Sequence, residues 1–325
     1  MTYFQFLMNK LSKNRFNLIG IVFIVMFIVI VYLFGNYSTT KNILAENIDL
    51  GNEYYIEQIK ENEQTLELAK QTNSYDEETY APVVTNLKYY KYMTKNNLEV
   101  DDFFRPIRGF SFLDYVLRNF LFILVSIGLC YSLSRAFCSN YYENIDLHKI
   151  IPIAKNYQFF CKLGLGIFIG VVLSTLICLT SLIAGGLACG LGSIHTPVMT
   201  YSINGAVEFK SFINYIFPFT ILVLLNICFM TNLILMIAKL THKSFTCMFV
   251  SLVVLIGGYA ICTHIVPLFS FVHFIPFTYL NPMLVLNGEC MMITGNASIK
   301  FIMGVIVLLI SNLVLFGISY SLERN

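Results

Sequence analysis

Residues 143–162 read Glu-Asn-Ile-Asp-Leu-His-Lys-Ile-Ile-Pro-Ile-Ala-Lys-Asn-Tyr-Gln-Phe-Phe-Cys-Lys, and a long apolar run lies on each side of them. The stretch opens with two acids, passes an apolar Ile-Ile-Pro-Ile core and ends with two lysines. It resembles neither a membrane span nor a loop. A short amphipathic segment held against a bilayer by a helix on each side is well placed to contact a soluble partner, so we expect the function to enter here.

The composition of the chain is that of a membrane protein. Hydrophobic residues make up 57% of its 325 residues, charged residues make up 12%, and the mean hydropathy is +0.69. A soluble domain carries about a quarter charged residues. Apolar runs of about 20 residues, the length that crosses a hydrocarbon core, recur along the chain. We therefore expect an all-α polytopic membrane protein.

The apolar runs predict six transmembrane helices. Their ranges are 17–35, 112–133, 163–187, 212–238, 245–265 and 301–320. The first run is longer than the 7–15 residues of a signal peptide and has no small-residue cleavage site after it, so we expect it to remain as an anchor. In the third run, Gly166 and Gly170 are spaced to let a neighbouring helix approach closely.

Residues 1–16 precede the first span and carry Phe4, Leu7, Met8 and Leu11 at helical spacing, with polar and basic residues on the other side. This pattern favours an amphipathic helix lying in the membrane interface. The alternative is an ordinary cytoplasmic tail.

Residues 37–110 differ in composition from the rest, with thirteen acids, eight bases and no cysteine. Two helix-like stretches, 53–71 and 79–96, are joined by a turn, and Pro82 falls near the start of the second, where a helix tolerates proline. We predict an extracellular helical hairpin between the first and second spans. The alternative is a loosely ordered loop.

Two connections between the predicted spans, 188–211 and 266–299, differ in composition. Residues 188–211 form a Gly-rich polar loop in our interpretation. Residues 266–299 are apolar but contain Pro267, Pro276 and Pro282, so they cannot form one straight span. We expect an outer re-entrant segment and loop, covered by protein or a cavity.

The distribution of basic residues predicts the orientation. With the N-terminus inside, the inner segments 1–16, 134–162, 239–243 and 321–325 together hold ten Lys and Arg against three acids. The short outer loops hold Lys210 and Lys300. The positive-inside rule therefore puts both termini in the cytoplasm. Abundant Asn, Lys and Ile suggest an AT-rich bacterial genome, so we expect the bacterial plasma membrane.

Signatures of enzymes and metal sites are missing from the sequence. No Gly-x-x-x-x-Gly-Lys-Ser/Thr, His-Glu-x-x-His or Gly-x-Ser-x-Gly occurs, and the nine cysteines are scattered without a Cys-x-x-Cys pair. We expect no catalytic residue, no metal and no cofactor in this chain, and a formal charge of +2 gives no reason to expect nucleic acid. The spans contain almost no ionisable residues, whereas ion-coupled carriers keep charges in mid-membrane, so an energy source outside the chain is expected.

Together these residues resemble the ABC-2 type transporter permease family, the transmembrane subunits of bacterial ABC exporters. The local match is Glu143 followed by Ile-Ile-Pro-Ile-Ala-Lys at 150–155 and then Phe-Phe-Cys-Lys at 159–162. In that family a glutamate precedes a Leu-Pro-Ile-Ser-Arg-like run, so Ala154 and Lys155 stand where Ser and Arg are frequent. The run around Pro276 and Pro282 is similar to the family's outer segment before its last helix. The likeness in architecture covers nearly the whole chain, and the insertion at 37–110 departs from the smallest members.

The resemblance implies a dimeric transmembrane domain, made with a second copy or a related permease chain and driven by two separate ATP-binding subunits that hold ATP and Mg. Residues 135–162 would be the cytoplasmic coupling segment, with a coupling helix over 140–152 seated on the ATPase. The expected contact residues are Glu143, Asp146, His148, Lys149 and Pro152.

Three functions follow from these observations. The first is an exporter permease for an amphipathic or hydrophobic substrate, such as an antimicrobial or signalling peptide, or self-protection against one, because an apolar wall in contact with membrane lipid suits such cargo. The second is a non-transporting membrane sensor or scaffold that binds an envelope ligand through its extracellular hairpin. The third, an intramembrane enzyme, is disfavoured because no catalytic constellation is present.

Overall fold

The computed structural model describes residues 3–12, 15–37, 52–72, 76–102, 104–138, 141–142, 145–146 and 154–324. The chain divides into two compact units, which we treat separately. Unit 1 comprises Met1–Met26, Arg118–Ile177 and Phe217–Asn325, and unit 2 comprises Phe27–Leu117 and Cys178–Ile216.

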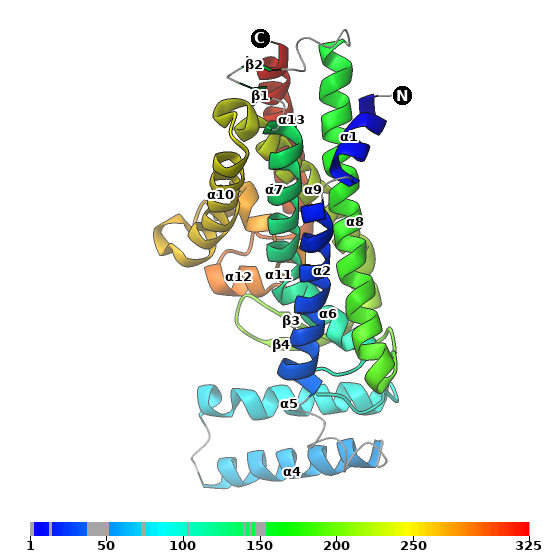
Figure 1. Ribbon diagram of the computed structural model, residues 1–325. Coiled ribbons are helices and arrows are strands. Elements are labelled where there is room, and N and C mark those ends of the chain that lie inside the picture. The colour runs from blue at the N-terminus through cyan, green and yellow to red at the C-terminus, as the bar shows by residue number, and fades with distance from the viewer. Residues whose placement is uncertain are drawn as a thin grey trace. The chain divides into compact units, whose positions relative to one another are not determined.

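Five helices in the described part of the chain are long and apolar enough to cross a membrane (Figure 1). They are α7 (Leu121–Cys138), α8 (Lys155–Cys189), α9 (Ile213–Thr241), α10 (Ser244–His264) and α13 (Phe301–Arg324). Eighteen residues of α-helix already extend about 27 Å, close to the thickness of the hydrocarbon core. The protein is therefore an α-helical polytopic membrane protein, as its composition predicted.

The first predicted span, 17–35, is less regular than the other five. The α-helix α2 (Arg15–Ile30) continues as the π-helix η1 (Val31–Tyr37), and the apolar helical stretch Gly20–Gly35 is shorter than the five spanning helices. A π-helix has i→i+5 hydrogen bonds, is rare, and occurs mostly as a single-turn bulge in an α-helix. The structure thus provides five spans and one shorter apolar helix where the sequence predicted six spans.

The second and third predicted spans also have different boundaries. In place of one helix over 112–133, α6 (Gly109–Asn119) ends before α7 begins at Leu121. Within unit 1, the carbonyl of Arg118 accepts a hydrogen bond from Asn281 Nδ2 at 2.8 Å. A side chain from a distant part of the chain therefore binds a backbone carbonyl next to the break between α6 and α7. The third helix, α8, has 35 residues and is about 52 Å long, and it starts eight residues earlier than predicted.

The predicted Gly-rich loop at 188–211 contains a β-hairpin, which our sequence analysis did not predict. Strands β3 (Pro197–Tyr201) and β4 (Val207–Ser211) pair antiparallel with Met199 opposite Phe209. The intervening turn holds Gly205 at φ +75°, a conformation that glycine adopts without steric cost. Alternating side chains around an Asn-Gly turn are a hairpin signal that our reading of the sequence overlooked.

Unit 2 contains the two helices predicted at 53–71 and 79–96, which appear as α4 (Asn52–Gln71) and α5 (Glu77–Lys95) and pack on each other (Figure 1). The side chain of Asp76 caps α5 by accepting the N–H of Thr79 at 3.2 Å. We had expected Pro82 near the start of this helix. Because α5 begins at Glu77, Pro82 lies inside the helix instead.

The core of unit 2 is rich in tyrosine. Its buried members are Tyr55, Tyr89, Met93, Leu98, Val100 and Ile107. Tyr89 donates its hydroxyl hydrogen to the carbonyl of Asp101 at 3.0 Å, and the backbone N–H of Asp101 donates to the Tyr55 hydroxyl at 3.1 Å. The phenol rings therefore bury apolar area while their hydroxyls bind the loop that follows α5.

The carboxyl group of Asp101 is buried in this core. Its Oδ1 accepts the backbone N–H groups of Asp102 at 2.9 Å and of Ile107 at 3.0 Å. Burial raises the pKa of Asp101, and these hydrogen bonds and the charge of Arg108 offset part of the rise, which leaves the pKa at about 6.

Unit 1 is held by close helix contacts. A Cβ atom placed on Gly166 would lie 2.2 Å from Thr231 Cγ2, and one on Gly170 would lie 2.4 Å from Ile227 Cγ2. Both glycines of α8 thus face α9, and the close approach that their spacing predicted is confirmed. The N-terminal helix α1 (Tyr3–Ser12) buries Tyr3 and Leu7 and contacts α7.

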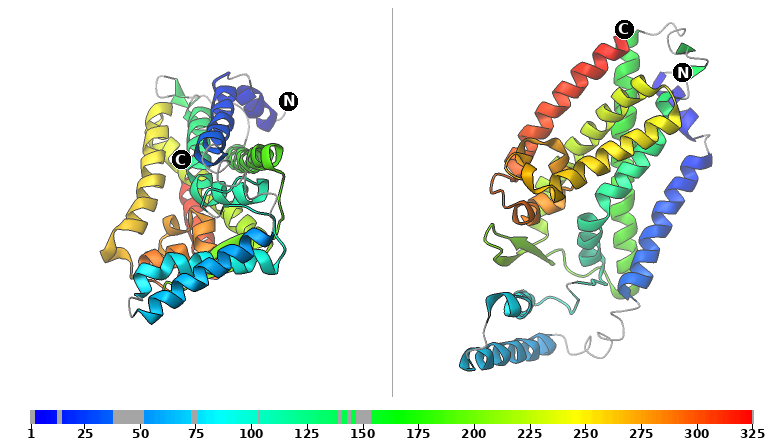
Figure 2. Two further views of the ribbon diagram at one scale, coloured as in Figure 1. Left: turned by 90° about the horizontal axis from the view of Figure 1, so that it is seen from below. Right: turned by 90° about the vertical axis from the view of Figure 1, so that its left-hand side faces the viewer.

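The apolar segment between α10 and α13 is a series of short helices, drawn in orange in Figure 2. They are η4 (Val266–Leu268), η5 (Val272–Phe274), η6 (Pro276–Tyr279), α11 (Pro282–Leu286) and α12 (Glu289–Thr294). Each of the three prolines lies in the first turn of one of these helices, where its missing N–H costs no hydrogen bond.

Candidate functional site

The predicted coupling residues cannot be placed as a set. Glu143, His148, Lys149 and Pro152 lie outside the described residues, and Asp146 is described in its backbone alone. Strand β1 (Tyr141–Tyr142) pairs antiparallel with β2 (Ile145–Asp146), so these four residues are extended. The prediction of a coupling helix over 140–152 is therefore wrong at these four residues.

The two helix ends that hold this segment are well anchored within unit 1. Phe137 and Cys138 at the end of α7 are buried, and Cys138 Sγ lies 3.9 Å from the carbonyl oxygen of Ala238 in α9. Helix α7 also packs along α10. The end of α7 is therefore in contact with α9, and the helix as a whole with α10.

The start of α8 is anchored to the end of α13. The ring of Phe159 packs edge-on against Phe316 and Tyr320, with centroid distances of 5.2 Å and 5.6 Å. The hydroxyl of Tyr320 donates to Asn156 Oδ1 at 2.9 Å. The segment at 139–154 is thus connected to packed helices at both of its ends.

A charged side chain lies on the same part of α8. Lys162 is 2% exposed, and Gln158, one turn earlier on the same face, is 4% exposed. A lysine is almost never buried to this extent unless its ammonium group interacts with a partner. The sequence placed Lys162 at the opening of the third span but did not predict its burial.

A polar seam, which we define as Asn226, Asn232, Asn312 and Ser319, connects α9 with its neighbours in unit 1. Asn232 Nδ2 donates to Asn312 Oδ1 at 3.1 Å, and Asn312 Nδ2 donates to the Leu225 carbonyl at 3.1 Å. The Ser319 hydroxyl donates to the Asn232 carbonyl at 3.2 Å. These hydrogen bonds join α9 to α13 and pair polar groups that would otherwise face lipid without a partner.

Asn226, the outlying member of the seam, binds the broken segment. Its Nδ2 donates to the carbonyl of Tyr279 at 2.7 Å, and the Tyr279 hydroxyl in turn donates to the carbonyl of His273 at 2.8 Å. Asn296 Nδ2 lies 3.0 Å from His273 Nδ1. His273 therefore has a structural environment, and no group of three potential metal ligands occurs among the described residues.

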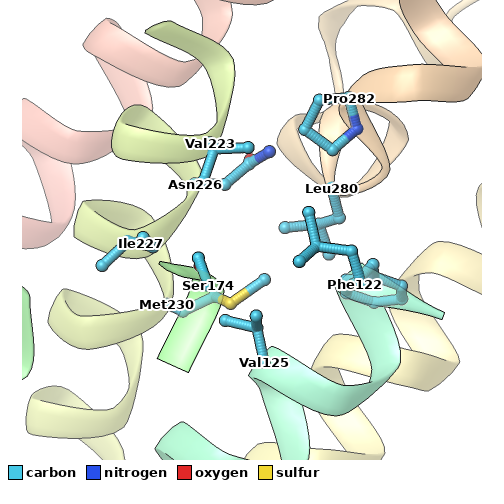
Figure 3. A pocket seen from close by; sticks show the side chains of 10 residues that line it. Phe122, Val125, Ser174, Val223, Asn226, Ile227, Met230, Leu280 and Pro282 are labelled. Atoms are coloured by element: carbon cyan, nitrogen blue, oxygen red, sulfur yellow. The ribbon is translucent and has the colours of Figure 1, made fainter. Parts of the chain in front are cut away.

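Asn226 also lines a small pocket of about 20 Å³ (Figure 3). The walls come from α7, α8, α9 and the broken segment, and the labelled neighbours include Phe122, Ser174, Met230 and Leu280. The volume is sufficient for one water molecule. The pocket can therefore hold a single polar atom against the Asn226 amide.

Four buried oxygen acceptors of unit 1 have no hydrogen-bond partner among the described residues. They are Asn226 Oδ1, Thr231 Oγ1, Asn232 Oδ1 and Asn281 Oδ1. An unpaired buried acceptor costs about 1–3 kcal/mol, so water or a polar ligand atom at these positions would stabilise the helices. The sequence identified the polar positions on α9, whereas their partners lie 53 to 87 residues away along the chain.

Comparison of the chain with protein-family models, with curated proteins and with solved structures finds no match.

Proposed function

We propose that this chain is the membrane-spanning subunit of an ATP-driven exporter of the ABC-2 type, with the segment between α7 and α8 as its docking site for the ATPase. The observation that carries the proposal is the anchoring of that segment. Cys138 at one flank packs on α9, and Asn156 and Phe159 at the other flank pack on α13. A movement imposed on the end of α7 or on the start of α8 would reach α9 and α13 through these contacts.

The charge distribution of the spanning helices supports an external energy source. Asp, Glu, Lys and Arg do not occur between residues 163 and 189 of α8, 213 and 238 of α9, or 301 and 322 of α13. Carriers coupled to protons or metal cations keep ionisable residues in the middle of the membrane. An exporter subunit driven by ATP hydrolysis in a partner does not need them.

In this proposal, α2 and η1 form the sixth span, both termini are cytoplasmic, and α4 and α5 form the extracellular hairpin. The apolar surface of the bundle suits an amphipathic or hydrophobic cargo, such as an antimicrobial or signalling peptide. Two ATP-binding subunits and a second permease chain complete the transporter, and ATP binding would bias it between two states.

Co-purification with the ATPase encoded beside this chain tests the docking site. We expect the wild-type chain to form a stable complex and the double variant Glu143→Lys, Asp146→Lys to lose it, because both acids would face the ATPase. The matched control is Glu57→Lys, Glu67→Lys, which makes the same charge change at two exposed positions of α4. The control should retain the complex and its ATP hydrolysis.

An ATPase complex that survives in the docking variant, or that is lost equally in both variants, would contradict the docking site. A chain that binds no ATPase would instead favour a membrane sensor or scaffold. In that case the variants of α4 would alter function and those at 143 and 146 would not.

A further inference from the structure

A second cavity in unit 1 is about 400 Å³ in volume and separate from the pocket at Asn226. Helix α2 contributes Gly20 and Phe23, α7 contributes Tyr131 and Ser132, and α8 and α10 complete the wall with Leu173 and Leu252. Its volume lies in the range of about 300–1,000 Å³ that small-molecule sites occupy. Since the wall is almost entirely apolar, the cavity suits a hydrocarbon group.

One end of the cavity differs from the rest because it is polar. Tyr131 and Ser132 lie there, one helical turn from Arg135 on the same helix. The guanidinium carbon of Arg135 lies 5.3 Å from the centroid of the Tyr131 ring, an arrangement typical of a cation–π contact. The wall of the cavity is therefore apolar apart from Tyr131 and Ser132, and Arg135 lies beside Tyr131, one helical turn beyond the lining residues.

Two glycines shape this space in different ways. A Cβ atom on Gly128 would lie 2.7 Å from Leu173 Cδ1, so this glycine lets α7 approach α8 beside the cavity. A Cβ atom on Gly20 would meet nothing within 4 Å, although Gly20 lines the cavity. The absence of a side chain at Gly20 leaves the volume open without serving a helix contact.

We propose that this cavity binds a single-chain amphiphile, with its hydrocarbon chain among α2, α7, α8 and α10 and an anionic head at Tyr131, Ser132 and Arg135. The volume, near the lower end of the usual range, fits one hydrocarbon chain. The cation at the polar end selects a negative head. Binding is a property of this chain alone, so the inference holds whether or not an ATPase docks between α7 and α8.

The absence of tryptophan from the chain permits a direct test. We would introduce one tryptophan as Phe23→Trp, in the cavity wall, and measure quenching of its fluorescence by a brominated fatty acid in nanodiscs of unbrominated phospholipid. A reference reporter, Leu313→Trp, lies on α13 outside the cavity, and the two replaced side chains have similar exposures of 66% and 72%. We expect saturable quenching at position 23 and quenching proportional to the fatty acid content at position 313.

Filling the cavity provides the second arm. Gly20→Leu should weaken binding at the Phe23→Trp reporter at least tenfold, whereas Gly317→Leu, at another glycine with open space around it, should leave binding unchanged. Arg135→Gln should weaken binding of the fatty acid about fivefold and leave a brominated monoacylglycerol unaffected, because the latter has no charge.

Three results would overturn the inference. The first is quenching at position 23 that follows bulk concentration as at position 313. The second is saturable quenching that persists in Gly20→Leu. The third is saturation by a brominated phospholipid and not by the fatty acid, which would identify the occupant as a structural bilayer lipid.

Discussion

The two units use different side chains to donate hydrogen bonds to backbone carbonyls. In unit 1, Asn226 donates to the carbonyl of Tyr279 and Asn281 donates to the carbonyl of Arg118. In unit 2, Tyr89 donates to the carbonyl of Asp101 and Tyr32 donates to that of Ile107. In each unit, a side chain donates a hydrogen bond to a backbone carbonyl that is distant along the chain or lies in an irregular segment.

The difference between amide and phenol follows from the surroundings. Lipid chains are as apolar as leucine, so helices in a bilayer gain little by burying large apolar groups and associate instead through close packing and hydrogen bonds. Outside the apolar helices, burial of a tyrosine ring in the core around Tyr55 removes apolar area from water and stabilises the fold directly. Unit 2 should therefore depend on ring volume, and unit 1 on small residues and amides.

The largest expected effect is at the aromatic core of unit 2. Tyr55→Ala removes a fully buried ring and should lower the free energy of opening of unit 2 by about 4 kcal/mol. Hydrogen exchange should show lost protection in α4 and α5, with α7 and α9 unchanged. Ile56→Ala, at a neighbouring residue that is 56% exposed, is the control and should have little effect. Equal loss of protection in α9 would contradict the division into two cores.

The titration of Asp101 should give the next largest effect. Because its folded pKa of about 6 lies above the ordinary value, protonation favours the folded unit 2. The resulting stabilisation is complete below about pH 4 and is lost as the pH rises through 6, with a total of up to about 3 kcal/mol. Hydrogen exchange corrected for intrinsic rates should show this slope, and Asp101→Asn should abolish it. Glu67→Gln at an exposed position should retain it.

In unit 1, overpacking should be more damaging than in an open part of the same helix. Gly166→Ala places a methyl group against Thr231 and should cost about 2 kcal/mol. Gly164→Ala, two residues earlier, meets nothing within 4 Å and should be neutral or slightly stabilising. Thermal denaturation in detergent compares the two variants. A similar melting temperature for both would mean that the contact of α8 with α9 adjusts without cost.

The smallest expected effect is at the polar seam. A double-mutant cycle of Asn232→Leu and Asn312→Leu should give a coupling energy of about 1 kcal/mol, since hydrogen bonds between membrane helices are weak on average. A coupling several times larger would remove the contrast with the tyrosine core. No coupling would mean that α9 and α13 are held by packing alone.

The sequence predicted the features that arise from local patterns. Apolar length identified the five spanning helices, proline spacing identified the broken segment, and Gly166 and Gly170 identified a close helix contact. Contacts between distant residues were not predictable in this way. Asn226 was recognisable as a polar residue in a span, but its partner at Tyr279 is 53 residues away.

The same reasoning explains the errors. The hairpin of β3 and β4 lies in a short stretch whose glycines we had read as signs of an irregular loop, and the break before Leu121 coincides with a hydrogen bond from Asn281, 163 residues from Arg118. The burial of Asp101 depends on Tyr55, 46 residues earlier in the chain. The docking residues around Glu143 stay a prediction from sequence.

The lack of charge in the central parts of the five spanning helices has an electrical consequence. Moving one elementary charge through the membrane field involves about 2.3 kcal/mol per 100 mV. Since Asp, Glu, Lys and Arg occur at the ends of these helices and not in their centres, rearrangements among them carry almost no charge across the field. The membrane voltage of the cell is therefore expected to act only weakly on the side chains in the centres of these helices.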